Sequence, residues 1–206
     1  MTDRWMKLFV DCLVDLTSDN IELRLTHDTH VTADGEKDKS SGYWDDTYIN
    51  PILCCSVSGK VDEWMPVFVH EYNHYRQWKE KSKEWKQTDK LCTNDTYVRI
   101  IEGGMDQIGI DAYFNAMRDL ELDCEKRTVS LLKKYKIQID TKDYIKKANA
   151  YIHFYNYMKQ YKRWYPDNKE PHLTPEIYNK CSCRFYKSYD NIPKELLTVY
   201  QKTYPL

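Results

Sequence analysis

Val67-Phe68-Val69-His70-Glu71-Tyr72-Asn73-His74 is the stretch of sequence that decides the fold. On a helix, His70 and His74 lie four positions apart on a single face and can reach one metal ion, with N–Zn bonds of about 2.0–2.1 Å. Glu71 lies on the adjoining side, where its carboxylate can reach a water at the metal without being a ligand. This arrangement is typical of a zinc hydrolase.

The flanks of this stretch predict a buried helix that runs to about Lys81. Gly59 breaks the chain before it, Asp62 or Ser58 can cap its start, and Pro66 falls in the first two turns, where a missing N–H costs little. The alternative is a buried helix whose histidines only satisfy hydrogen bonds, with the glutamate on a solvated edge. The paired spacing favours the metal site.

A zinc hydrolase needs a third protein ligand. The extended motif, which turns at a Gly towards a third His, is excluded because Gln77 and Glu80 occupy those positions. A later helix, predicted from about residue 105 to 135, carries Glu121 and Glu125 on one face. Beside a dication, one carboxylate can ligate and the other can accept the second N–H of a ligating histidine. Without a metal, the same pair is an ordinary solvated helix face.

His70-Glu71-x-x-His74 followed by Glu121-x-x-Cys124-Glu125 resembles the gluzincins, in which a Glu on a downstream helix is the third zinc ligand. It is most similar to small forms with a Glu-x-x-Ala-Asp or Glu-x-x-Ala-Asn second motif, among them soluble peptidases that cleave phage repressors and membrane prenyl-protein peptidases. The resemblance implies that Glu121 ligates and that Glu125 supports a histidine. Cys124 and Glu125 depart from that pattern.

The same resemblance extends to phage-encoded metallopeptidases, which share His-Glu-Tyr-x-His followed by Gln77-Trp78. It covers roughly residues 40–135 and says little about the last third of the chain. What it implies for the fold is a minimal zincin-like domain.

Length, charge and cysteine usage bound the class of protein. The chain has 206 residues and a net charge of −1, without a run of about 18 apolar residues or a signal-like N-terminus, so we expect no membrane span. Seven cysteines without a CxxC pair favour reduced thiols. These features predict a cytoplasmic protein, in the host cytoplasm if the chain is virus-encoded.

We expect an α+β, mostly α fold with a small N-terminal sheet, the HExxH helix, a second Glu-bearing helix and a helical C-terminal part. The prediction is one zincin-like domain over residues 1–206, with a core at 1–135 and a helical extension at 136–206 packed on it. The remaining expected elements are a helix at 4–17, a strand from Ile21, a loop at 34–41, short strands at 42–44 and 48–53, a charged loop at 82–98, a long helix at 142–165 stopped by Pro166, a short helix around 176–178, and a last helix from Ile192.

Two surface segments have alternative interpretations. The segment Tyr43–Ile49 is a candidate edge strand that pairs with an extended peptide, or else a plain edge strand. Between Lys126 and Arg163, basic residues far outnumber acidic ones, and aromatics lie among them. Nucleic-acid contact is conceivable there, but a solvated helix face is the favoured interpretation.

The sequence therefore predicts a zinc-dependent metallopeptidase that acts on a peptide or protein substrate. His70, His74 and Glu121 bind Zn²⁺, and Glu71 is the general base. Tyr151 and His153 are the nearest candidates for stabilising the oxyanion. The alternative is a non-catalytic zincin-like module with a binding or structural role, for instance in a viral particle.

Overall fold

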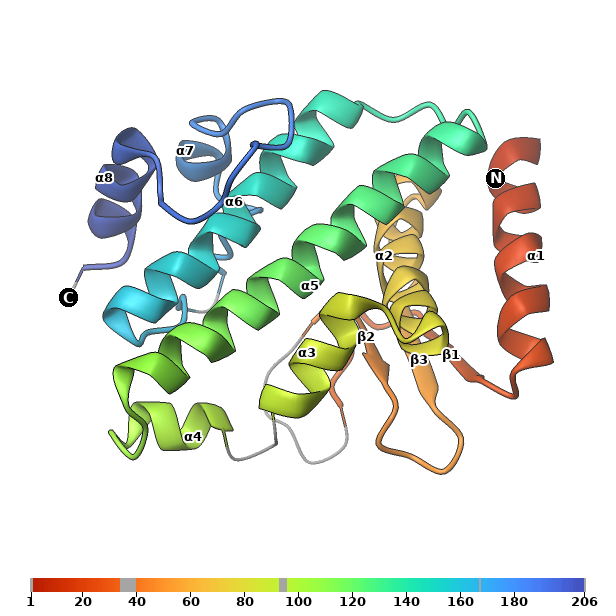
Figure 1. Cartoon of the computed structure of the whole chain (residues 1–206). Helices are drawn as coiled ribbons and strands as arrows, with labels where there is room; N and C mark the ends of the chain where they lie inside the picture. The colour runs from red at the N-terminus through yellow and green to blue at the C-terminus, as the bar shows by residue number, and fades with distance from the viewer. Residues whose placement is uncertain (1, 34–39, 93–95, 167, 206) are drawn as a thin grey trace. The chain divides into compact units, whose positions relative to one another are not determined.

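The computed structural model of the chain describes residues 2–33, 40–92, 96–166 and 168–205 (Figure 1). The described part is α+β and mostly helical, as expected. Its elements are α1 (Asp3–Ser18), β1 (Glu22–Thr26), β2 (Gly42–Asp45), β3 (Ile52–Ser56), α2 (Val61–Glu80), α3 (Lys83–Leu91), α4 (Thr96–Ile101), α5 (Gln107–Lys134), α6 (Thr141–Tyr161), α7 (Pro175–Tyr178) and α8 (Lys194–Thr203). No helix within this part has both the length and the apolar character needed to cross a membrane.

The chain divides into two compact units, each built from two separate segments. The first unit comprises Met1–Ser82 and Cys124–Ile139, and the second comprises Lys83–Asp123 and Asp140–Leu206. One boundary between the units therefore falls within α5. Each unit has an apolar core of its own.

The first unit contains a three-stranded sheet in the order β1-β3-β2. β3 runs parallel to β1, with Leu53 opposite Leu23, and antiparallel to β2, with Leu53 opposite Trp44. β2 is thus an edge strand of this sheet, and it overlaps the expected segment Tyr43–Ile49 only at its start. The strand expected at 48–53 is shifted along the chain to Ile52–Ser56. Every residue of β3 is buried, which explains its apolar run: Leu53 and Cys55 join the main core, whereas Ile52 and Cys54 pack on the other face.

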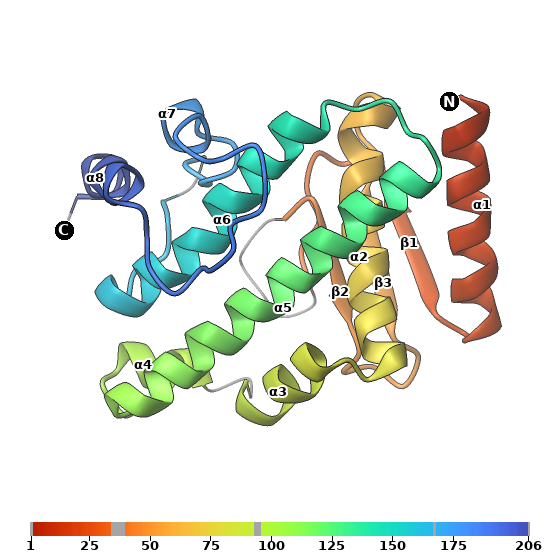
Figure 2. The ribbon, with the colours of Figure 1, turned by 45° about the horizontal axis from the view of Figure 1, so that its top comes forward.

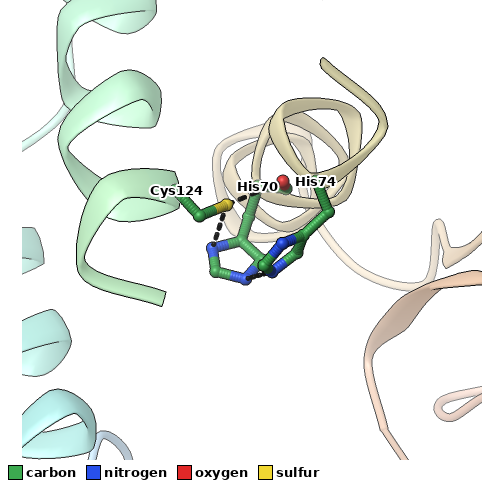
Figure 3. Close-up of side chains that lie close together, drawn as sticks. All are labelled: His70, His74 and Cys124. Atoms are coloured by element: carbon green, nitrogen blue, oxygen red, sulfur yellow. Dashed lines mark hydrogen bonds between the residues drawn. The ribbon is translucent and has the colours of Figure 1, made fainter. Parts of the chain in front are cut away.

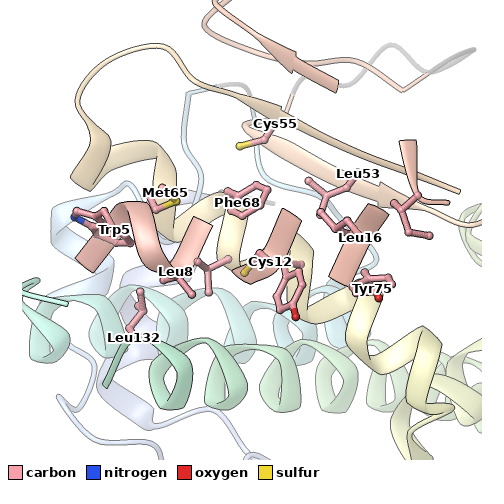
Figure 4. Close-up of a cluster of buried hydrophobic side chains, with 13 residues drawn as sticks. Trp5, Leu8, Cys12, Leu16, Leu53, Cys55, Met65, Phe68, Tyr75 and Leu132 are labelled. Carbon is pink, nitrogen blue, oxygen red and sulfur yellow. The ribbon is translucent and has the colours of Figure 1, made fainter. Parts of the chain in front are cut away.

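Helices α1 and α2 and the last part of α5 complete the core of the first unit. In α1 the buried residues are Trp5, Leu8, Cys12 and Leu16, which recur at helical spacing. They meet Phe68 of α2 and residues of β3 and α5 in one cluster (Figure 4). α2 contacts β2 and β3 along its length and is seen beside the sheet in Figure 2. This packing fixes the helix that carries the HExxH motif.

The ends of α2 differ in part from expectation. Lys60 is the N-cap residue, and its backbone N–H donates to Oε2 of Glu63 at 3.0 Å, so the expected caps Asp62 and Ser58 are wrong. Gly59 has φ +89°, a left-handed turn that glycine adopts readily. At the other end, Lys81 adopts the left-handed conformation and ends the helix where the sequence predicted.

The second unit is helical and has an aromatic core. Phe154, Tyr157 and Tyr200 lie at its centre, all nearly inaccessible to solvent. The expected loop at 82–98 is wrong, since α3 and the start of α4 occupy its described part. The long helix expected at 142–165 ends at Tyr161, because Lys162 turns into the left-handed conformation four residues before Pro166. Residues 34–39 of the loop expected at 34–41 lie outside the described residues.

Candidate metal centre

His70 and His74 project from one face of α2 and their rings converge. Their Nε2 atoms lie 3.1 Å apart, and the ring planes meet at 81° with centroids 4.7 Å apart. Two imidazole nitrogens bound to one zinc ion at about 2.0–2.1 Å in tetrahedral geometry are about 3.3 Å apart. The pair therefore has the separation that a shared metal ion requires.

The other nitrogen of each ring faces an oxygen atom. Nδ1 of His74 lies 2.9 Å from Oε1 of Gln77, a fully buried side chain. Nδ1 of His70 lies 3.4 Å from Oε1 of Glu125. An oxygen acceptor favours the ring proton on Nδ1, and with that tautomer in both rings the two Nε2 lone pairs face each other across the 3.1 Å gap. The support of a histidine by Glu125 was expected, whereas the contact of Gln77 was not, because a glutamine three residues after a histidine has no distinctive pattern.

Cys124 is the residue that sequence reasoning did not treat as a ligand. Among the described residues, one group of potential metal ligands gathers here: His70, His74 and Cys124, whose ligand atoms lie within 4.8 Å of one another. The sulfur lies 3.6 Å from Nδ1 of His70, and its thiol donates to the main-chain carbonyl of the same residue at 3.2 Å. Figure 3 shows the sulfur beside that edge of the ring, while the other nitrogen faces His74. A metal held by both Nε2 atoms would thus lie on the opposite edge of the His70 ring from this sulfur.

The register between α2 and the end of α5 is held by polar contacts beyond the histidines. Nδ2 of Asn73 donates to the carbonyl of Val69 at 2.9 Å and to Oγ1 of Thr128 at 3.1 Å, in a buried position. Farther along, Arg127 forms an ion pair with Glu80 at 2.6 Å. These contacts keep Cys124 and Glu125 opposite the first histidine.

Glu71 is buried on α2 against the sheet. Its side chain is 8% exposed. A Cβ atom added to Gly42 would lie 3.0 Å from Cγ of Glu71, so the start of β2 crosses directly over its stem. Burial, together with a smaller effect of the negative charge of Glu71, raises the pKa of Cys55 to about 12. The side chain therefore lies between α2 and the sheet, where it has little contact with water.

Glu121, the predicted third ligand, is not part of the group of three. It lies one helical turn before Glu125 on α5, in the part assigned to the second unit. There its charge adds to the burial that raises the pKa of Tyr155. Its role as a ligand stays a prediction.

The two residues expected to stabilise an oxyanion have different surroundings in the second unit. His153 is 1% exposed, and its ring packs against Tyr186 and Tyr189. Tyr151 is half-buried, with its hydroxyl 3.4 Å from that of Tyr155. Ring packing thus explains why His153 is buried. Tyr151 instead lies beside Tyr155, the residue whose pKa is raised in part by the charge of Glu121.

Comparisons with family models, curated proteins and solved structures gave no match to this chain. The resemblance to the gluzincins therefore depends on the motif residues alone. What can be argued about function comes from the geometry around the two histidines.

Proposed function

We propose that this protein is a zinc-dependent peptidase whose metal is held by His70 and His74. One observation supports this most directly: the two Nε2 atoms lie 3.1 Å apart while the opposite nitrogens face Gln77 and Glu125. A histidine pair that served only packing would not need both Nε2 atoms turned towards one point. Imidazole nitrogens suit zinc, although other divalent transition metals bind the same donors.

The third ligand in this proposal is Glu121. On a continuous helix it shares a face with Glu125, one turn away, whose carboxylate faces the ring of His70. Two imidazoles and one carboxylate form a zinc donor set that leaves a position open. When bound, the zinc ion would lower the pKa of water and polarise a substrate carbonyl.

Glu71 is the general base of the proposed reaction. Its carboxylate takes a proton from the attacking water and returns it to the leaving amine. Burial against the sheet keeps this carboxylate in one place and limits its contact with bulk water. A zinc site with only a structural role has no need of a glutamate here.

β2 is the proposed binding strand for the substrate. It is an edge strand, it contacts α2, and its first residue adjoins Glu71. An extended peptide that pairs with such an edge forms main-chain hydrogen bonds whatever its sequence. The substrate class is therefore an extended segment of polypeptide.

Glu71→Gln tests the proposal. The variant should keep the metal content of the parent, because the glutamate is not a ligand, and should lose at least about 100-fold in cleavage rate, since a general base contributes about 10²–10⁴-fold. The measurement is cleavage of a peptide library and of denatured casein, followed by mass spectrometry, with metal content determined for each sample.

Glu102→Gln is the matched control, because Glu102 is exposed and lies in the second unit. It should cleave at the parent rate. A Glu71→Gln protein as active as its parent would reject the mechanism. A metal-loaded parent that cleaves nothing would leave the non-catalytic module as the function.

A further inference from the structure

We infer that Gly42 is a positioning residue for Glu71: the missing side chain at the start of β2 is what lets the strand lie against the glutamate stem and fix the direction of its carboxylate. The inference rests on the proposed function only where it concerns catalysis. Its structural part concerns packing between β2 and α2 within the first unit.

The space around Gly42 is closed on three sides. A Cβ atom there would lie 3.0 Å from Cγ of Glu71, 3.0 Å from Cγ1 of Val67 and 3.1 Å from the main-chain oxygen of Cys54. The two separations from carbon atoms are shorter than ordinary contacts between carbon atoms, which are about 3.5–4.0 Å. Two of the neighbours are side-chain atoms on successive turns of α2, and the third is a main-chain oxygen of the adjacent strand.

The backbone conformation does not explain the glycine. Among the described glycines, Gly59 and Gly103 have positive φ and Gly42 does not. It lies within the regular antiparallel register, opposite Cys55, where any L residue can be accommodated. A glycine is therefore required at this position because a side chain would contact Glu71 and Val67 too closely.

The consequence for Glu71 is a restricted side chain. With β2 directly over its Cγ, the glutamate cannot fold back towards the strand, so rotamers that direct the carboxylate there are excluded. The side chain is also 8% exposed, so solvent offers little alternative space. A general base fixed in this way is preorganised for proton transfer.

A double-mutant cycle on the metal-free protein tests the contact directly. Gly42→Ala should lower the urea midpoint of unfolding in the parent, and by less than half as much in a Glu71→Ala background, where Cγ is gone. Gly104→Ala is the matched control: a Cβ there meets only the oxygen of Arg99, at 3.5 Å. Its midpoint shift should be the same in both backgrounds.

An equal shift from Gly42→Ala in both backgrounds would overturn the inference. If Gly42→Ala does not fold, the double variant Gly42→Ala/Glu71→Ala must fold. Failure of both would assign the clash to the oxygen of Cys54 and would equally reject the role proposed for Glu71.

The catalytic part is tested on the metal-loaded protein. Gly42→Ala should lower kcat by more than 10-fold with KM changed by less than 2-fold and metal content unchanged, because the displaced group is a base and not a ligand. A rise in KM with kcat intact would show that Gly42 acts through substrate binding and reject the positioning role. A parent without any activity would refute the proposed function, while the unfolding cycle would still decide the contact.

Discussion

Three side chains on α5 could complete the coordination of a metal bound by His70 and His74. Glu121 is proposed from the sequence pattern, whereas Cys124 and Glu125 are the residues that the structure brings to the ring of His70. Both of these face Nδ1, the nitrogen turned away from the other ring. Their positions suit support of the ligand better than coordination of the same ion.

The metal content of single alanine variants distinguishes a residue that coordinates the metal from one that only supports a histidine. Glu121→Ala should lose stoichiometric metal, and Cys124→Ala should keep it. Glu125→Ala should weaken affinity by about 10- to 100-fold, the usual effect of removing a group that orients a ligating histidine. The measurement is elemental analysis after dialysis, with Glu102→Ala as the exposed control. Loss of metal in Cys124→Ala together with its retention in Glu121→Ala would move the third ligand to the sulfur.

His153 should make the stability of the second unit depend on pH. Both ring nitrogens are buried, and neither has a hydrogen-bond partner within the described part of the chain. Burial, with a smaller effect from the charge of Arg118, lowers the pKa of His153 to about 4 from its ordinary value of 6.5. The neutral ring is thus favoured in the folded state, so stability is complete above pH 6.5 and falls between pH 6.5 and pH 4.

The full loss at His153 corresponds to about 3 kcal/mol below pH 4. It can be measured as the free energy of unfolding in urea from pH 7.5 to pH 4. His153→Phe, which keeps the ring contacts with Tyr186 and Tyr189, should flatten this profile. His27→Phe, at an exposed site in the first unit, should leave it unchanged. A profile that is the same in the parent and in His153→Phe would contradict the prediction.

Helix α1 and its C-cap residue carry an acidic row that binds the helix to the rest of the first unit. Three aspartates, each four residues after the last, accept hydrogen bonds from tyrosine hydroxyls of α2 and of the segment after α5. The pairs are Asp11 with Tyr135, Asp15 with Tyr72, and Asp19 with Tyr75. The apolar residues of the same helix pack into the core, so α1 is held by apolar contacts and by hydrogen bonds along the adjoining row.

Protonation of this acidic row should lower the stability of the first unit at acid pH. A hydrogen bond from Tyr135 lowers the pKa of Asp11, and bonds from Lys79 and Tyr75 lower that of Asp19. A carboxylate with a lowered folded pKa adds stability above its ordinary pKa and loses it as pH falls through the folded value. Tyr75→Phe should therefore reduce the fall in the thermal midpoint between pH 5 and pH 2.5.

Tyr178→Phe is the control for this effect, because Tyr178 lies in α7 of the second unit, away from the acidic row. Its midpoint should follow the parent across the same pH range. Identical acid profiles for Tyr75→Phe and the parent would show that the tyrosine bond does not hold the carboxylate in its charged form.

The elements that the sequence predicted best are those with a regular apolar pattern. α1, α2 and α5 have buried residues or motif residues at helical spacing, and the structure contains each of them near the expected bounds. α3 has no buried residue, so its charged sequence carried no signal of a helix. The sequence did not predict that α6 ends at Tyr161, because Lys162 adopts a left-handed conformation that is uncommon for lysine.

Contacts between distant segments could be predicted only where chemistry linked them. The spacing of His70 and His74 fixes their convergence within one helix, and the motif resemblance pointed to Glu125 on another. The thiol contact of Cys124 and the close approach of Gly42 to Glu71 depend on how helix and strand pack, which no local pattern encodes. The same holds for the division of the chain, since the core residues of both units alternate along the sequence.

The split composition of the first unit has a consequence during translation. The ribosome synthesises α2, which carries both histidines, before Lys83–Asp123 of the second unit. The segment Cys124–Ile139, which contributes Leu132 to the core of the first unit, follows only after that. Only the part of the core that packs against Leu132 thus stays uncovered until that later segment emerges. In the metal site that we propose, Glu121 and Glu125 both lie on α5, so the site is complete only after this helix has left the exit tunnel.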